Sequence, residues 1–140
     1  MCVGERLSDD DALDLFASND LLAIGELAAL ANHKKNGDTV YFNVNRHINY
    51  TNLCVNRCTF CAFSRDRGEA GVYTMALNEI LKKTAEASAA GATEIHMVGG
   101  LHPDLPFDFY LEMLAAIKAY CPQLHIKAFT AVEIDYFASL

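Results

Sequence analysis

The apolar residues of this chain recur with two periods, one typical of helices and one typical of strands. Spacings of three and four residues predict helices over residues 9–17, between Asn19 and Gly37, and over 76–91, 107–121 and 133–140. Alternating or β-rich runs predict extended segments over 39–52, 93–100 and 124–131, with a turn at Asn45 and Arg46. Because strands and helices alternate from residue 46 onward, the pattern indicates an α/β fold with a parallel sheet.

The predicted strand–helix units follow two short helices and make up the larger part of the chain. They occupy about 95 residues, whereas a complete (β/α) barrel needs roughly 200 residues or more. We therefore expect the N-terminal part of a TIM-type (β/α) barrel. In this interpretation residues 1–38 form a helical extension, and residues 39–140 form the first three β/α units of a truncated barrel. The last predicted strand would then be an unpaired edge.

The composition is that of a globular protein and excludes several kinds of partner. The 140 residues are 52% hydrophobic and carry a formal net charge of −7. This acidic balance argues against nucleic acid as a partner, because phosphate backbones bind clustered Lys and Arg. No apolar run approaches the about 18 residues of a membrane-spanning helix, so we expect no membrane partner. The N-terminal sequence lacks the pattern of a secretory signal, which favours a cytoplasmic location with reduced thiols.

The candidate chemistry is concentrated in three closely spaced cysteines. Cys54, Cys58 and Cys61 form a C-x3-C-x2-C pattern, while Cys2 and Cys121 are isolated and are interpreted as an exposed thiol and a packing residue. Closely spaced thiolates bind soft metals or iron–sulfur clusters. A structural zinc site usually has four ligands, and only three are found together here. Three ligands on a four-iron cluster would leave one iron open to a small molecule, although an incomplete zinc site stays an alternative.

The position of this motif resembles that of one enzyme superfamily. The cysteines follow the first predicted barrel strand, at the end of the barrel where active sites lie, and Phe60 precedes the third cysteine. This arrangement resembles the radical SAM superfamily. The resemblance implies a [4Fe–4S] cluster on Cys54, Cys58 and Cys61, with S-adenosylmethionine (SAM) on the fourth iron. Reductive cleavage of SAM would then give a 5′-deoxyadenosyl radical.

A pair of glycines at the end of the second predicted strand extends the resemblance. In the superfamily, glycines at the position of Gly99 and Gly100 let the backbone approach the methionine end of SAM. The absence of a side chain would serve such a close approach. We also assign Phe60 and Thr130 to the cofactor-binding set.

Polar and apolar side chains alternate along the three predicted strands. If the more apolar set faces the helices, the barrel lumen receives the polar set, which is His47, Asn49, Thr51, Glu94, His96, His125 and Lys127. A polar and partly cationic lumen suits a carboxylate-bearing substrate. We assign the substrate to His96, His102, His125 and Lys127. The alternative for His102, which precedes Pro103, is a role in shaping that turn only.

Longer runs narrow the resemblance to one family within the superfamily. The chain resembles aminofutalosine synthase, the radical SAM enzyme of the futalosine route to menaquinone. The resemblance lies in the runs "GDTVYFNVNRHINYTNLCVNRCTFCAFSR", "EIHMVGGLHPDLPFDFYLEMLAAIK" and "LHIKAFTAVEI". The resemblance implies addition of the adenosyl radical to the dicarboxylate 3-[(1-carboxyvinyl)oxy]benzoate, giving aminodeoxyfutalosine. It also implies an electron donor such as flavodoxin or ferredoxin. Tyr50 stands where we expect the family to have proline, and we expect little consequence for the site.

Other functions remain open at this point. Two relatives share the cysteine pattern and the "GGLHP" segment: dehypoxanthine futalosine cyclase and the deazaflavin-forming synthases. A small iron–sulfur electron carrier or a zinc-stabilised module would represent a different class, although each normally uses four protein ligands. Because later barrel strands are expected to contribute to SAM and substrate binding, we predict that these 140 residues alone are inactive.

Overall fold

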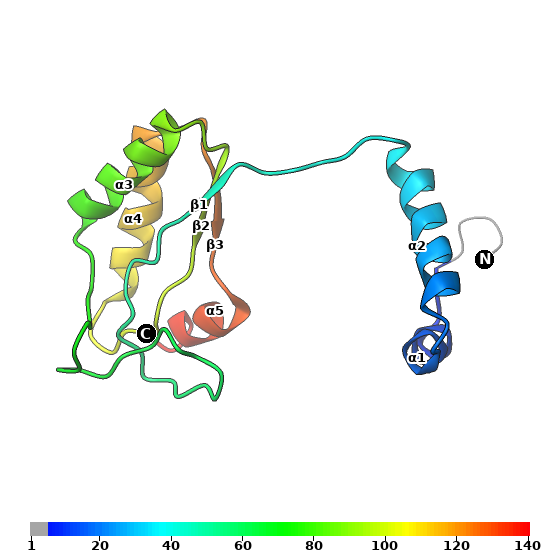
Figure 1. Cartoon of the computed structure of the whole chain (residues 1–140). Coiled ribbons are helices and arrows are strands. Elements are labelled where there is room, and N and C mark those ends of the chain that lie inside the picture. The colour runs from blue at the N-terminus through cyan, green and yellow to red at the C-terminus, as the bar shows by residue number, and fades with distance from the viewer. Residues whose placement is uncertain (1–5) are drawn as a thin grey trace. The chain divides into compact units, whose positions relative to one another are not determined.

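The computed structural model describes residues 6–140, which form two compact units (Figure 1). One unit ends at Phe42, and the other spans Asn43–Leu140. Cys2, interpreted above as an exposed thiol, lies outside the described residues. Among residues 6–140, none of the helices combines the length and the apolar character required to cross a bilayer.

The first unit contains the two predicted helices, α1 (Asp9–Ala17) and α2 (Leu21–Asn36). Ser8 and Asp11 form a capping box at the start of α1, in which each side chain accepts from the other residue's backbone N–H, at 3.1 and 2.9 Å. Asp20 caps α2 by accepting from the N–H of Ala23. Neither helix buries a side chain, so the capping interactions rather than a core define this unit.

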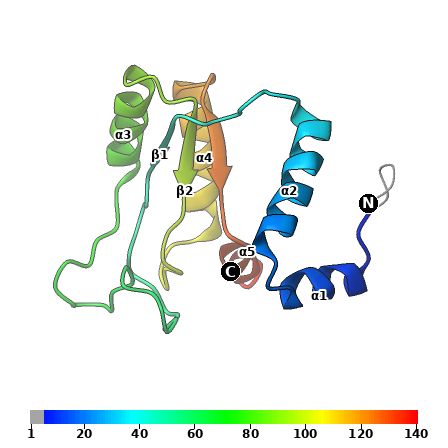
Figure 2. The same ribbon diagram turned by 45° about the vertical axis from the view of Figure 1, so that its right-hand side comes forward.

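The second unit is a parallel three-stranded sheet with two helices on one of its faces (Figure 2). The strands β1 (Asn45–His47), β2 (Glu94–Met97) and β3 (His125–Ala128) lie in the order β1-β2-β3. The helices α3 (Leu77–Ala89) and α4 (Phe107–Tyr120) connect them, and α5 (Ala131–Phe137) follows β3. Parallel strands require long crossovers, which these helices provide, so the predicted alternation of strands and helices is confirmed.

The first strand differs from its prediction. Asn45 and Arg46, predicted as a turn, are paired within β1 with Glu94 and Ile95 of β2. Sheet pairing satisfies their backbone groups and therefore overrides their preference for turns. Residues 39–44, predicted as extended strand, contain no strand.

The core lies between the sheet and the helices α3 and α4. Ile95 and Met97 of β2, and Ile48 directly after β1, contribute from the sheet side. The helices contribute Ile80, Met113 and Ile117, and all six side chains are at most 1% exposed. An aromatic group next to them includes Tyr50, Tyr110, Phe129 and Phe137. Cys121 is also buried in this cluster, which confirms its interpretation as a packing residue. Burial of this apolar surface fixes which face of the sheet remains open.

Replacement of Ile95 by alanine should destabilise the second unit by about 2–5 kcal/mol, because a fully buried side chain would leave a cavity between sheet and helices. Urea unfolding measures the change in the free energy of unfolding. The matched control is Ile134→Ala, because Ile134 is 55% exposed and its replacement should change stability by no more than about 0.5 kcal/mol. Equal losses in the two variants would contradict this assignment of the core.

Candidate functional site

The three motif cysteines lie in a loop that follows β1, at the carboxyl ends of the strands. We call residues 54–61 the cysteine loop. Cys54 is half-buried, whereas Cys58 and Cys61 are exposed. In residues 6–140, no three or more His, Cys, Asp or Glu side chains are gathered closely enough to hold a metal ion. The assignment of these cysteines as cluster ligands therefore stays a prediction.

The surroundings of two of the sulfurs nevertheless suit thiolate ligands. Cys54 Sγ accepts the backbone N–H of Leu101 at 3.2 Å, and Cys61 Sγ accepts that of Ser64 at 3.4 Å. The hydrogen bonds from Ser64, with a further one from Phe63, lower the pKa of the Cys61 thiol. Backbone N–H donors stabilise a negatively charged sulfur. The donor set therefore fits an iron–sulfur cluster by its chemistry, with Cys54, Cys58 and Cys61 as the residues that would hold it.

Two buried polar residues fix the base of the cysteine loop. Thr51 is fully buried and donates to the carbonyl of Tyr73 at 2.8 Å. The side chain of Asn52 donates to the carbonyl of Gly71 at 2.9 Å and accepts from the N–H of Tyr73 at 2.8 Å. The prediction that Thr51 faces the lumen is therefore wrong, because its hydroxyl satisfies backbone groups beneath the loop.

The two glycines after β2 allow the chain to pack closely on itself. A Cβ on Gly99 would lie 2.4 Å from the ring of Tyr50, and a Cβ on Gly100 would lie 2.2 Å from the carbonyl oxygen of Leu53. The N–H of Gly100 also donates to the carbonyl of Thr51 at 2.9 Å. The missing side chains therefore bring the end of β2 into contact with the cysteine loop. Their role in binding SAM stays a prediction.

A buried carboxylate connects the ends of all three strands. Glu133 is 1% exposed, and its Oε1 accepts from the hydroxyl of Tyr50 at 2.8 Å and from the N–H of Gly99 at 2.9 Å. Its Oε2 accepts from the N–H and the hydroxyl of Thr130, at 2.7 and 2.8 Å. Burial of a carboxylate is costly unless its oxygens have hydrogen-bond partners. Here each of the two Glu133 oxygens accepts two hydrogen bonds.

Sequence reasoning did not single out Glu133, although a signal was available. Thr130 and Glu133 form the T-x-x-E pattern of a capping box at the start of α5. The cofactor-binding role predicted for Thr130 stays a prediction, and its hydroxyl is already hydrogen-bonded to Glu133.

Tyr50 has a larger role than its sequence position indicated. The residue is completely buried, and its ring fills the space beside Gly99. Burial first, and then the neighbouring Glu133 carboxylate, raise the pKa of the Tyr50 phenol. Tyr50 therefore packs against Gly99, a predicted cofactor-binding residue, although its effect on the site stays a prediction.

The face of the sheet opposite the helices carries the predicted polar side chains in two rows. The strand register places Asn45, Glu94 and His125 in one row, and His47, His96 and Lys127 in the row nearer the cysteine loop. In β2 the alternate residues Ile95 and Met97 are buried, so the predicted alternation is confirmed there. The polar face therefore brings three of the four predicted substrate residues together.

Contacts within the polar face involve one acidic residue. The Glu94 carboxylate is hydrogen-bonded to Nε2 of His96 and lies 3.7 Å from Nε2 of His125. The hydrogen bond from His96 lowers the pKa of Glu94, and the charges of His125 and Lys127 act in the same direction. The rings of His47 and His96 meet edge to face with centroids 5.1 Å apart. Glu94 therefore orients His96 within this face.

The remaining predicted site residues lie elsewhere. His102 is buried, which lowers the pKa of its imidazole, and its Nδ1 accepts from the N–H groups of Asp104 and Leu105 at 3.0 and 3.2 Å. These bonds give His102 a role in shaping its turn, and its substrate role stays a prediction. The side chain of Phe60 is fully exposed, so the structure gives it no internal contact.

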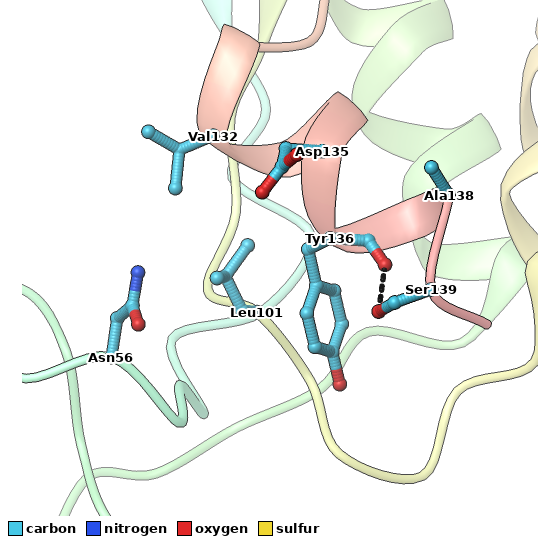
Figure 3. Close-up of a pocket in the computed structure, with 7 residues that line it drawn as sticks. All are labelled: Asn56, Leu101, Val132, Asp135, Tyr136, Ala138 and Ser139. Atoms are coloured by element: carbon cyan, nitrogen blue, oxygen red, sulfur yellow. Dashed lines mark hydrogen bonds between the residues drawn. The ribbon is translucent and has the colours of Figure 1, made fainter.

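A pocket of about 460 Å³ opens between the cysteine loop and α5 (Figure 3). Tyr136 lies in its wall and donates its hydroxyl to the carbonyl of His102 at 3.1 Å. Leu101, whose N–H faces Cys54, also lines it. The lining residues are Asn56, Leu101, Val132, Asp135, Tyr136, Ala138 and Ser139. Polar groups are therefore available to a ligand next to the cysteine loop.

Comparison with known proteins identifies the family. A family model described as the Radical SAM superfamily matches residues 48–136. The chain is 44% identical over 137 residues to aminodeoxyfutalosine synthase of Streptomyces coelicolor, covering 98% of this chain and 35% of the relative. It is 42% identical over 141 residues to 5-amino-6-(D-ribitylamino)uracil–L-tyrosine 4-hydroxyphenyl transferase of Methanopyrus kandleri, covering 100% of this chain and 38% of the relative.

A solved structure has a similar fold. The chain is similar to the crystal structure of methylornithine synthase, with a TM-score of 0.67 and 23% identity, over 88% of this chain and 37% of that one. The chain therefore belongs to the radical SAM superfamily, whose members use a [4Fe–4S] cluster and SAM. The predicted α/β fold of the radical SAM type is confirmed. The chain spans about a third of the length of the curated relatives described above.

Replacement of Gly100 by alanine should destabilise the second unit by about 1–3 kcal/mol, because the new Cβ would overlap the Leu53 carbonyl. Urea unfolding and the iron content after anaerobic reconstitution measure the effect. Gly25→Ala is the control, because no atom lies within 4 Å of a Cβ at that helical position. A Gly100→Ala variant as stable as the wild type would show that this close approach is not required.

Proposed function

We propose that the protein carrying this chain is a radical SAM enzyme that joins the 5′-deoxyadenosyl group of SAM to 3-[(1-carboxyvinyl)oxy]benzoate, forming aminodeoxyfutalosine. The observation that carries the proposal is the cysteine loop at the carboxyl ends of the strands, with Cys54 anchored to the end of β2 by the N–H of Leu101. The 44% identical relative named aminodeoxyfutalosine synthase supports this choice of reaction.

In this proposal Cys54, Cys58 and Cys61 hold the cluster, and residues near the strand ends receive SAM. When bound, the cluster supplies the electron that cleaves the sulfonium bond of SAM. The N–H donors to Cys54 and Cys61 stabilise the thiolate form that a cluster ligand needs. Gly99 and Gly100 keep the loop close to the sheet, and the closed barrel of the full-length protein would exclude water from the reactive species. A flavodoxin or ferredoxin would deliver the electron.

The polar face of the sheet is proposed to bind the substrate carboxylates. Lys127 and His96 lie in the row nearer the cysteine loop, and Lys127 is a donor without acceptor capacity. Glu94 holds His96 in place. An anionic group would therefore be placed at this row, on the side of the sheet that faces away from α3 and α4.

A second reaction is favoured by a specific finding. The relative that is 42% identical is named as a transferase joining 5-amino-6-(D-ribitylamino)uracil and L-tyrosine. Each substrate set should be offered with SAM and a reductant to the full-length gene product, with products identified by mass spectrometry. Formation of aminodeoxyfutalosine supports the first proposal, and a product derived from tyrosine would replace it with the second.

We also propose that residues 1–140 alone bind the cluster without catalysing turnover. The chain spans 35% and 38% of the two relatives, and its polar sheet face is open in this structure. An assay of SAM cleavage by the anaerobically reconstituted chain tests this statement, and robust turnover would contradict it.

Alanine at Cys54, Cys58 or Cys61 should abolish the iron and sulfide content expected for a [4Fe–4S] cluster, because each replacement removes one of three protein ligands. Metal analysis and absorption spectroscopy after anaerobic reconstitution measure this loss. Cys121→Ala is the matched control, since this buried thiol lies in the apolar core. If all three variants keep the wild-type cluster content, the motif does not hold a cluster.

Replacement of Lys127 by alanine should raise KM for the carboxylate substrate by about tenfold or more with a smaller change in kcat, because a charge-assisted hydrogen bond is lost. Steady-state kinetics of the full-length enzyme provide the measurement. Lys82→Ala, at an exposed position of α3, is the control for loss of a positive charge. An unchanged KM in Lys127→Ala would remove Lys127 from the substrate site.

A further inference from the structure

The buried Glu133 carboxylate lies where the three strand ends meet the cysteine loop, and the function proposed above gives it no role. We propose that Glu133 is a positioning residue for the cluster. It holds residues 99–101 so that the Leu101 N–H faces the sulfur of Cys54, and it thereby raises the reduction potential of the cluster. This inference rests on the proposed function, because it requires that Cys54 bind the cluster.

The donors around the Glu133 carboxylate match its two oxygens. Glu133 accepts four hydrogen bonds, two from backbone N–H groups and two from hydroxyls, at 2.7–2.9 Å. A carboxylate is an acceptor-only group and can satisfy all four donors. An amide in its place would direct its NH2 group at the N–H of either Gly99 or Thr130. The four donors therefore require a carboxylate at position 133, and an amide of the same shape cannot satisfy them.

The backbone of residues 99–101 links Glu133 to Cys54. Three successive N–H groups each have a different partner: Gly99 donates to Glu133, Gly100 donates to the Thr51 carbonyl, and Leu101 donates to Cys54 Sγ. Tyr50 and Leu53 pack against the open sides of the two glycines. Because this segment has no side chains at 99 and 100 to hold it, the hydrogen bond to Glu133 fixes its first residue.

The Leu101 N–H would affect the reduction potential of the cluster. A hydrogen bond to a ligating sulfur withdraws electron density and stabilises the reduced state, so the reduction potential rises. Loss of the Leu101 donor would therefore lower the potential of the cluster.

No ion pair accounts for the burial of this carboxylate. No Lys, Arg or His among the described residues forms a salt bridge with Glu133. Burial of an ionisable group is costly, and apolar residues of similar volume are often equally or more stabilising. The two Tyr residues of the aromatic core illustrate the difference: the Tyr50 hydroxyl reaches Glu133, while the equally buried Tyr110 hydroxyl has no partner in the described part of the chain.

The test compares Glu133→Gln and Tyr50→Phe with wild type in the anaerobically reconstituted full-length gene product. The readout is the EPR signal of the reduced cluster during a redox titration, together with iron and sulfide content and thermal unfolding. For Glu133→Gln we expect the ratio of reduced to oxidised cluster at a fixed potential to fall about tenfold. Tyr50→Phe removes only one of the four donors and should produce a smaller shift in the same direction, which keeps the test decisive if Glu133→Gln does not fold.

Matched controls separate this effect from changes in charge or core packing. Glu112→Gln removes a carboxylate from an exposed position of α4, and Tyr110→Phe removes a buried hydroxyl without a hydrogen-bond partner. Both controls should leave the potential unchanged, and Tyr110→Phe should not destabilise the fold. A wild-type potential in folded, cluster-loaded Glu133→Gln and in Tyr50→Phe overturns the inference but leaves the proposed function intact. Failure of the wild-type full-length protein to bind a cluster overturns both.

Discussion

The hydrogen bonds of the buried Glu133 carboxylate are the constraint on which the rest of the site depends. Parallel strands are joined by long crossovers, so their carboxyl ends are not connected to one another by tight turns. Here one side chain joins all three ends, through Tyr50 after β1, Gly99 after β2 and Thr130 after β3. Apolar packing between sheet and helices determines where the strands lie, but it does not determine the positions of the loops that follow them. The hydrogen bonds of the Glu133 carboxylate determine the positions of those loops.

The same region explains why glycine is required after β2. Glycines near a bound cofactor are usually attributed to the space that the ligand needs. In this structure the space beside Gly99 and Gly100 is filled by Tyr50 and by the backbone of Leu53. The glycines therefore serve internal packing. Their N–H groups are hydrogen-bonded to Glu133 and to the Thr51 carbonyl, so a ligand here could use only their carbonyl groups. The two roles are compatible, because a ligand can be bound closely only by a loop that is itself held closely to the sheet.

The sequence allowed the fold class, the cysteine loop and the polar face of the sheet to be predicted, because each depends on periodicity or on spacing within one segment. Features that depend on contacts between distant segments were missed. Asn45 and Arg46 have turn propensity, yet pairing with β2 makes them a strand. Thr51 follows the alternation of β1, yet a bond to the Tyr73 carbonyl buries it. Glu133 could be recognised locally as a capping residue, but its bond to Tyr50, 83 residues away, could not be inferred without the structure.

The charges on the polar face restrict where an anionic group can be bound. The row formed by Asn45, Glu94 and His125 has an anionic group at its centre, whereas the row nearer the cysteine loop has Lys127 and two imidazoles and no acidic residue. Like charges repel at short distance, so a carboxylate would be stabilised in the second row and repelled in the first. The hydrogen bond between Glu94 and His96 weakens this repulsion. It does not remove the repulsion, because the other imidazole near Glu94, that of His125 at 3.7 Å, is largely exposed to solvent. Within this sheet the field therefore favours an anionic group in the row nearer the cysteine loop, and it disfavours one beside Glu94.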